Sequence, residues 1–191
     1  MSTQKVKKIT PEEYLEIERN SQFKSDYYNG EMFGLAGASY AHNKITRNIS
    51  KFIGNQLTDG SCEEFQSDLK VKELESNLFT YPDIVVVCGE PEFYDEEKDV
   101  ITNPTLIIEV LSKSTENYDR GFKFELYRRI KSLKDYFLVS QEKISIEYYS
   151  RNPDESWTLK EFHDLKQTIN IESIKCSLSL KEVYHKIKFE K

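Results

Sequence analysis

The chain has 191 residues, of which 27 are Lys or Arg and 33 are Asp or Glu, so its formal net charge is −6. A chain of this length can bury a core that is stable without disulfides or metals. With only 7 Gly and 5 Pro but 12 Tyr and 11 Phe, the composition excludes a disordered or collagen-like chain. The longest apolar run, Ile84–Cys88, is too short to cross a membrane. No apolar stretch follows the first lysines as a signal peptide would require, so we expect one cytoplasmic domain over residues 1–191.

The acidic balance and the cysteines exclude further classes of protein. An acidic chain does not bind nucleic acid through its overall charge, so any such contact would need a local basic patch. The three cysteines, Cys62, Cys88 and Cys176, are odd in number and far apart, and their spacing is not typical of a zinc site. We therefore expect no disulfide framework, and we interpret Cys88 as a core residue.

The first third of the chain carries clear helix and hairpin signals. Thr10–Glu13 combines a Thr cap, Pro at the first helical position and Glu at the third, which predicts a helix that runs to about Asn20. The pair Asn29-Gly30 lies between two strand-like runs and predicts a hairpin. Apolar residues at helical spacing then predict a helix over about Ser39–Leu57.

The rest of the chain alternates strand-like and helix-like patterns. Alternation predicts one strand over Phe65–Glu73, with Asp68 and Lys70 on its solvated face, and continuous apolar runs predict buried strands over Tyr81–Cys88 and Thr105–Leu111. The acidic stretch between them is expected to be a loop, Glu90–Asn103. Further elements are expected as a helix over 119–131, strands over 135–139 and 144–149, and a helix opened by a capping box at 179–182. This order predicts a mixed α/β (α+β) domain around one sheet.

Glu109 does not fit the pattern of its surroundings. It lies inside the run Leu106–Leu111, where every other residue is apolar. A bare buried carboxylate costs several kcal/mol, so Glu109 must be paired, protonated or bound to a metal. A salt bridge, or a place at the exposed end of the strand, explains it equally well.

Three further charged residues draw attention, each with an ordinary explanation of its own. Asp83 opens a buried strand after Pro82, although Asp is common as a turn residue there. Lys123 lies in the apolar stripe of a predicted helix, although its long side chain could reach water. Glu31 follows the hairpin turn, where solvated residues are usual. His42 falls within an apolar helical stripe, as many core histidines do.

Taken together, these residues suggest a metal site. Two carboxylates from neighbouring strands, Asp83 and Glu109, could converge on a divalent cation with Lys123 beside them. Oxygen ligands of this kind suit Mg²⁺ or Mn²⁺ better than zinc. Such a centre commonly serves phosphoryl chemistry.

Several segments, in this order along the chain, resemble one known family. The segments Tyr81–Val87, Pro104–Thr115 and Asp119–Tyr127, preceded by Tyr28–Glu31 and Ala38–His42, are similar to the Uma-type family of restriction-endonuclease-like proteins, within the PD-(D/E)XK nuclease superfamily. The resemblance implies a restriction-endonuclease-like fold, in which a central mixed sheet is flanked by helices.

The same resemblance implies roles for individual residues. Asp83 matches the first metal-binding aspartate and Glu109 the second acidic ligand, to which the backbone carbonyl of Val110 could add a third. The superfamily pattern places a lysine two residues after the glutamate, where this chain has Leu111. Lys123 matches the lysine that this family takes from the following helix.

Glu31 matches an acidic residue that could complete the metal site, and His42 could support that site from the second helix. The resulting hypothesis is a Mg²⁺- or Mn²⁺-dependent DNA endonuclease that acts as a homodimer, since cutting both strands commonly uses two active sites. A catalytically silent domain of the same fold, used for nucleic-acid binding or assembly, is the alternative. A hydrolase that uses two carboxylates for acid–base work is a third possibility, but it gives Lys123 no role. The expected local basic patch consists of Arg120, Arg128, Arg129 and Lys131.

Overall fold

The centre of the fold is a mixed six-stranded sheet, seen in a computed structural model that describes residues 8–113 and 115–189. Its strands lie in the order β11-β10-β9-β8-β6-β3, and only β8 and β9 run parallel to each other. Their bounds are β3 (Cys62–Gln66), β6 (Ile84–Cys88), β8 (Leu106–Leu111), β9 (Asp135–Ser140), β10 (Ile146–Arg151) and β11 (Trp157–Phe162).

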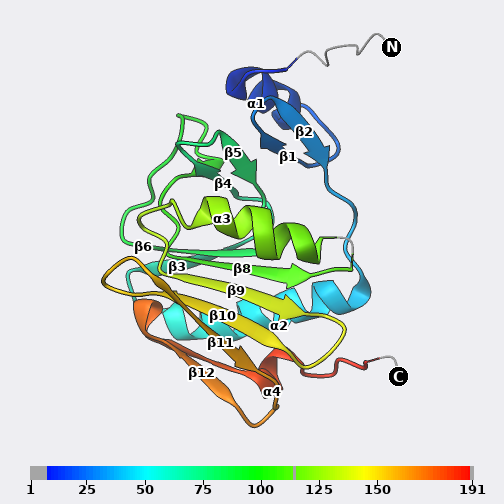
Figure 1. Ribbon diagram of the computed structural model, residues 1–191, viewed down its shortest axis with the longest axis vertical. Coiled ribbons are helices and arrows are strands. Elements are labelled where there is room, and N and C mark those ends of the chain that lie inside the picture. The colour runs from blue at the N-terminus through cyan, green and yellow to red at the C-terminus, as the bar shows by residue number, and fades with distance from the viewer. Residues whose placement is uncertain (1–7, 114, 190–191) are drawn as a thin grey trace.

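Helices cover both faces of this sheet (Figure 1). Helix α2 (Tyr40–Leu57) packs on one face, and a π-helical turn, η1 (Tyr118–Lys123), continues into α3 (Phe124–Tyr127) on the other. Alternate residues of β8 serve the two cores: Ile108 packs with the α2 side and Ile107 with the α3 side. A strand that is buried on both faces is usually apolar at every position. The sequence of β8 follows this rule, with Glu109 as the exception.

A second sheet carries the N-terminal part of the chain above the first (Figure 1). Its strand order is β2-β1-β5-β4-β7. Its bounds are β1 (Ser25–Tyr28), β2 (Glu31–Gly34), β4 (Lys70–Glu73), β5 (Leu78–Thr80) and β7 (Val100–Ile101), and α1 (Pro11–Arg19) packs beside it. A two-stranded sheet of β12 (Thr168–Ile171) and β13 (Cys176–Ser179), with the 3-10 turn η2 (Glu172–Ile174) between them, leads into α4 (Leu180–Val183).

The N-terminal signals of the sequence are confirmed. Thr10 accepts a hydrogen bond from the N–H of Glu13, whose side chain accepts one from the N–H of Thr10, so the capping box is complete. Asn29 and Gly30 both have positive φ, 46° and 96°, which is the backbone that a two-residue hairpin turn needs. The helix predicted over about Ser39–Leu57 is α2, and the side chain of Ser39 caps it by accepting a hydrogen bond from the N–H of His42.

Two predictions about the sheets are wrong. The structure has three sheets rather than one. The predicted strand Phe65–Glu73 is divided by a turn into β3 and β4, which belong to different sheets. Lys70 is buried rather than solvated, because β4 lies inside the second sheet, and a 2.7 Å hydrogen bond to Asp99 compensates for its lost hydration; Asp68 is exposed as expected.

The later elements also differ in detail. The helix expected over 119–131 is shorter and begins as a π-helix. Ser179 precedes α4, but its side chain makes no capping hydrogen bond, so the predicted capping box is wrong although the helix exists. The expected loop Glu90–Asn103 contains the short strand β7. None of the helices in residues 8–113 and 115–189 is long and apolar enough to span a bilayer.

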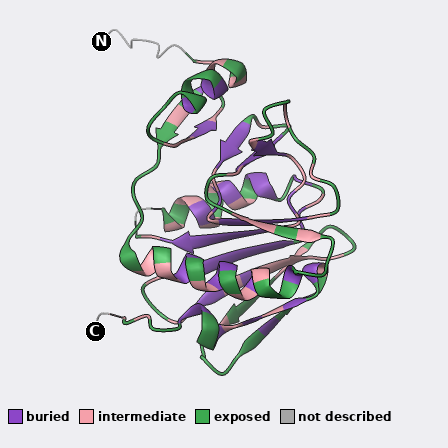
Figure 2. Ribbon diagram, turned by 180° about the vertical axis from the view of Figure 1, so that it is seen from behind, coloured by how far each residue is buried: buried purple, intermediate pink, exposed green. Residues whose placement is uncertain are grey.

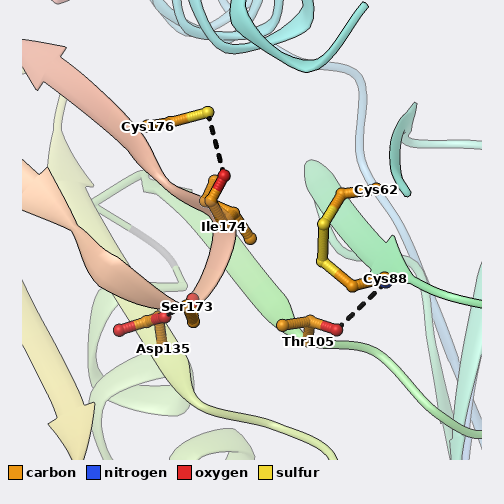
Figure 3. Close-up of a disulfide and its surroundings, with 7 residues drawn as sticks. All are labelled: Cys62, Cys88, Thr105, Asp135, Ser173, Ile174 and Cys176. Atoms are coloured by element: carbon orange, nitrogen blue, oxygen red, sulfur yellow. Dashed lines mark hydrogen bonds between the residues drawn. A yellow bond between two sulfur atoms is a disulfide. The ribbon is translucent and has the colours of Figure 1, made fainter. Parts of the chain in front are cut away.

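The expectation about the cysteines is corrected by a disulfide between Cys62 and Cys88 (Figure 3). The two residues are directly opposite each other in the antiparallel pair β3–β6, with Cα atoms 3.9 Å apart. The spacing of the cysteines in the sequence could not predict this disulfide. The two residues meet only because β3 and β6 pair in one particular register, which depends on the packing of the sheet. Cys176 is free and buried.

Candidate active site

Asp83 lies where β6 begins, next to the middle of β8. The antiparallel pair Ile84–Ile108 continues the register so that Asp83 faces the position of Glu109. Its Oδ2 atom accepts a 2.7 Å hydrogen bond from the N–H of Val110 and lies 3.1 Å from Nε2 of His42. The carboxylate is therefore held by the neighbouring strand on one side and by α2 on the other.

Glu109 is buried, with 4% of the residue exposed. Its Oε1 atom accepts hydrogen bonds from Nζ of Lys123 at 3.1 Å and from the hydroxyl of Tyr127 at 3.2 Å. The Tyr127 hydroxyl is also 2.7 Å from Oγ1 of Thr80. The polar partners that a carboxylate needs inside an apolar strand thus come from η1 and α3.

Lys123, at the end of η1, is the centre of a cluster of three carboxylates. Its Nζ atom lies 3.1 Å from Glu109, 3.4 Å from Asp119 and 3.7 Å from Asp26, and all four side chains are buried. Asp119 comes from one turn earlier on η1, and Asp26 comes from β1 of the N-terminal hairpin. The cluster therefore joins the central sheet, its covering helix and the second sheet at one point.

Burial dominates the electrostatics of the cluster. The pKa of Glu109 is raised to about 8, mainly by burial and to a smaller extent by Asp119 and Asp83, while Lys123 lowers it. Burial likewise raises the pKa of Asp26, against the effect of Lys123. For Lys123 burial alone would lower the pKa, but Glu109 and Asp26 raise it well above its ordinary value. The lysine therefore stays charged, while burial disfavours the ionised forms of Glu109 and Asp26.

A divalent cation at this place would favour the ionised carboxylates that burial disfavours. Asp83 and Glu109 offer oxygen ligands from adjacent strands, the type that Mg²⁺ and Mn²⁺ prefer. Within the part of the chain that the structure describes, no three His, Cys, Asp or Glu residues form a complete ligand set. Mg²⁺ usually takes one or two protein carboxylates and fills its other positions with water and substrate phosphate, so two carboxylates suffice.

The structure brings together most, but not all, of the residues expected at the site. Asp83, Glu109 and Lys123 lie there, and His42 contacts Asp83 as the second helix was expected to do. Glu31 is exposed on β2, opposite Tyr28, and among the described residues it forms no hydrogen bond or ion pair with Asp83, Glu109 or Lys123. Asp26 is the carboxylate of the hairpin that contacts Lys123.

Asp26, Asp119 and Tyr127 are parts of the cluster that sequence reasoning missed. Asp26 precedes two tyrosines in a hairpin, where a charged residue usually faces solvent, so nothing marked it. Asp119 carried a usable signal, since it stands four residues before Lys123 and such pairs meet on a helix. Tyr127 stands four residues after Lys123 and was counted only as part of the apolar stripe.

Neighbouring acids neutralise two of the four residues of the expected basic patch, Arg120 and Arg129. Arg120 pairs with Glu116 and Glu147, at 2.7 and 2.8 Å. Arg129 lies 3.4 Å from Glu125. Arg128 is stacked over a phenylalanine ring, and Lys131 is exposed.

Comparisons with known proteins define first the class of fold and then the family. A solved structure described as "a putative nuclease belonging to DUF820", from Anabaena variabilis, superposes with a TM-score of 0.74 at 17% identity and covers 92% of this chain and 97% of that one. The fold is restriction-endonuclease-like, a mixed α+β architecture whose sheets are flanked by helices.

Sequence matches identify the family. Residues 11–181 match the model of the Uma2 family, described as "Putative restriction endonuclease". The chain is 35% identical over 182 residues to the uncharacterized protein slr1290 of Synechocystis sp., covering 95% of this chain and 94% of that protein. It is 39% identical over 153 residues to the uncharacterized protein sll1609 of the same organism, covering 80% and 86%. The chain belongs to the Uma2 family, and this membership supports a nuclease, a phosphodiester hydrolase, as its class of enzyme.

Proposed function

We propose that this protein is a Mg²⁺- or Mn²⁺-dependent DNA endonuclease. The observation that carries the proposal is the buried carboxylate of Glu109, which faces Lys123 on one side and the start of β6, with Asp83, on the other. A buried carboxylate–lysine pair contributes no more stability than apolar residues of the same volume, which supports a role in function rather than in folding. In a family described as restriction endonucleases, hydrolysis of a phosphodiester bond is that function.

Each residue of the site has a role in this proposal. Asp83 and Glu109 hold the cation, together with the backbone carbonyl of Val110. When bound, the cation supplies Lewis-acid polarisation of the phosphate and lowers the pKa of a water molecule. His42 and the N–H of Val110 fix the orientation of Asp83.

Lys123 keeps its proton and acts through its charge. Its ammonium group orients the attacking water and stabilises the negative charge that develops on the phosphate oxygens. Two further points stay proposals: Glu31 completes the site from the hairpin, and two copies of the chain act together, so that each cuts one strand of a duplex.

Metal titration followed by DNA cleavage tests the proposal. Mn²⁺ is titrated calorimetrically into the wild type, Glu109→Gln and Asp83→Asn, and the same samples are then incubated with supercoiled plasmid. We expect the wild type to bind Mn²⁺ and to nick the plasmid only with the metal, and both variants to lose at least tenfold in metal affinity and to lose nicking. Absence of Mn²⁺ binding by the wild type would disprove the metal mechanism.

A catalytically silent domain that binds nucleic acid is the second candidate, and one observation favours it. Lys123 and Tyr127 already occupy Oε1 of Glu109, whose pKa of about 8 leaves it mostly protonated at neutral pH without a cation. In a silent domain this cluster would serve only to join the two sheets. The wild type would then bind DNA without cutting any plasmid, relaxed or supercoiled, at any Mn²⁺ concentration, and Asp83→Asn would bind DNA equally well.

A further inference from the structure

The outward face of α2 carries a positively charged groove that the proposed active site does not use. The groove lies between α2 and the end of α4 and has a volume of about 810 Å³. Lys44, Arg47 and Lys51 line it from α2 and Lys186 from beyond α4, whereas Glu182 is the single acidic residue that lines it. Its positive charge contrasts with the net charge of −6 of the whole chain.

These cations are not neutralised by other parts of the protein. Lys44, Arg47 and Lys51 follow one another at three- and four-residue spacing, so they form one stripe along about 10 Å of helix. Arg47 and Lys51 are exposed, and neither they nor Lys186 forms an ion pair with any residue in the described chain, unlike Arg120 and Arg129. In Figure 2 this side of α2 runs across the molecule with its exposed positions outward.

The groove is held in shape by hydrogen bonds between its two walls. The side-chain amide of Asn48 donates to the carbonyl oxygens of Val183 and His185, at 3.0 and 3.1 Å. Because α2 is also packed against the central sheet, the spacing between its cations and Lys186 is fixed before any ligand arrives. A preformed site of this kind loses little entropy when a ligand binds.

An exposed aromatic ring lies at the end of the groove nearest the active site. Tyr40, in the first turn of α2, has 78% of its surface exposed, and Nζ of Lys44 lies 5.2 Å from the centre of its ring. Two residues later, His42 turns inward and contacts Asp83. The same helical turn thus borders both the groove and the proposed active site.

We propose that the α2–α4 groove binds the phosphate backbone of a single nucleic-acid strand as it leaves the active site, with one base stacked on Tyr40. Regularly spaced cations beside an exposed aromatic ring are the combination that sequence-independent proteins use to bind single strands. The groove and the central sheet lie on opposite sides of α2, so a nucleic acid that reaches both must bend around the first turn of that helix. A flexible single strand can bend in this way. The inference rests on the proposed nuclease function, since that function brings nucleic acid to the neighbouring site.

Binding measured without metal tests the groove separately from catalysis. A labelled oligothymidylate of about 20 nucleotides is titrated with protein in EDTA, and fluorescence anisotropy is followed at several salt concentrations. The test variant is Lys44→Gln/Arg47→Gln/Lys51→Gln. Its matched control is Lys143→Gln/Lys160→Gln/Lys166→Gln, which changes three exposed lysines elsewhere and has the same net charge. We expect the groove variant to bind at least tenfold more weakly, with a salt slope smaller by about 2, and the control to bind as the wild type does.

Each other outcome contradicts a specific part of the inference. Equal loss in both variants would show that only net charge matters, and unchanged binding by the groove variant would disprove the groove. A duplex that binds as tightly as the single strand, or a Tyr40→Ala variant with unchanged affinity, would overturn the assignment to a single strand. If the wild type binds through the groove but never cleaves DNA with Mn²⁺, the proposed function fails and the groove stands. If it cleaves and the groove variant binds normally, the groove fails and the function stands.

Discussion

Lys123 shows how a charge is kept inside this protein. Its ammonium group has three carboxylates within 3.7 Å and almost no contact with water. Buried ions are tolerated only when their partners compensate for the lost hydration, and removal of one partner leaves the others uncompensated. The stability of the cluster therefore depends on the lysine more than on any single carboxylate.

Lys123→Ala is expected to lower the free energy of unfolding by about 3–5 kcal/mol, because it leaves Glu109, Asp26 and Asp119 buried without their cation. Urea unfolding of the metal-free protein measures the loss. Lys131→Ala, at an exposed position, serves as the control and should change the stability by less than about 0.5 kcal/mol. A loss below 1 kcal/mol for Lys123→Ala would show that the carboxylates are protonated in the native state.

At the scale of the residue, the sequence predicted the site in part. Glu109 was conspicuous because its neighbours are all apolar, and Lys123 because it interrupts an apolar stripe. Asp26 was not conspicuous, because it lies in a short hairpin whose neighbouring residues are also polar, so its charge does not interrupt an apolar pattern. Burial of such a residue is decided by the sheet that packs against it, which no local pattern encodes.

At the scale of the element, the acidic loop before β8 fixes α1 to the second sheet. Asp99 accepts hydrogen bonds from Arg19 of α1, at 2.6 and 3.1 Å, and from Lys70 of β4 at 2.7 Å. Asp95 accepts a further bond from Arg19. The hydrogen bonds from Arg19 and Lys70 lower the pKa of Asp99 to about 2.

This pKa predicts a stability that depends on pH in one direction. Because the folded-state pKa lies below the ordinary value of 3.8, the ionised form of Asp99 stabilises the folded state, and this contribution is complete only above that value. It is lost as the pH falls from about 4 through 2. Asp99→Asn should therefore have a lower Tm than the wild type at pH 6, and the difference should shrink as the pH falls through about 2 and vanish below it. A constant difference across this range, in thermal unfolding followed by circular dichroism, would contradict the assignment.

The disulfide between β3 and β6 predicts a second element-scale effect. It closes a loop of 26 residues, and the chain-entropy model gives such a cross-link about 3 kcal/mol. Reductant should therefore lower the urea midpoint of the wild type. The double variant Cys62→Ser/Cys88→Ser should start at the lower value and show no further change on reduction. If reductant leaves the urea midpoint of the wild type unchanged, the disulfide does not stabilise the protein.

Elements with strong local signals were predicted well, and those decided by tertiary pairing were not. The capping box of α1 and the apolar run of β8 specify their own structure. The turn that separates β3 from β4 contains neither Gly nor Pro, so the run Phe65–Glu73 looks like one strand. The last strands, β11 to β13, are short, and about half of their residues are polar, so they carry a weak strand signal although each pairs with a strand next to it in the sequence.

At the scale of the whole molecule, the residues proposed to hold the cation lie close to the point where both large sheets meet, at the contact between Lys123 and Asp26. Any ligand that binds only the folded state stabilises it, by about 2.7 kcal/mol at a hundred times its Kd. Saturating Mg²⁺ should accordingly raise the Tm of the wild type by roughly 5–10 °C. K⁺ at equal ionic strength controls for screening. The increase should be absent in Glu109→Gln; an equal increase in that variant would place the bound cation elsewhere.

The geometry of the charge cluster depends on the number of residues in the π-helical turn Tyr118–Lys123. An α-helix advances about 100° per residue, so the one extra residue in a π-turn changes the direction of everything that precedes it. Deletion of Gly121, which has no neighbour within 4 Å at its Cβ position, would allow the segment to rewind as α-helix. Lys123 would remain attached to α3, and Asp119 would stand three residues before it instead of four, a spacing that still places both side chains on one face of an α-helix. The 3.4 Å contact between Lys123 and Asp119 would then have to form again from a backbone that is one residue shorter, so the length of this turn, and not only its side chains, determines the geometry of the cluster.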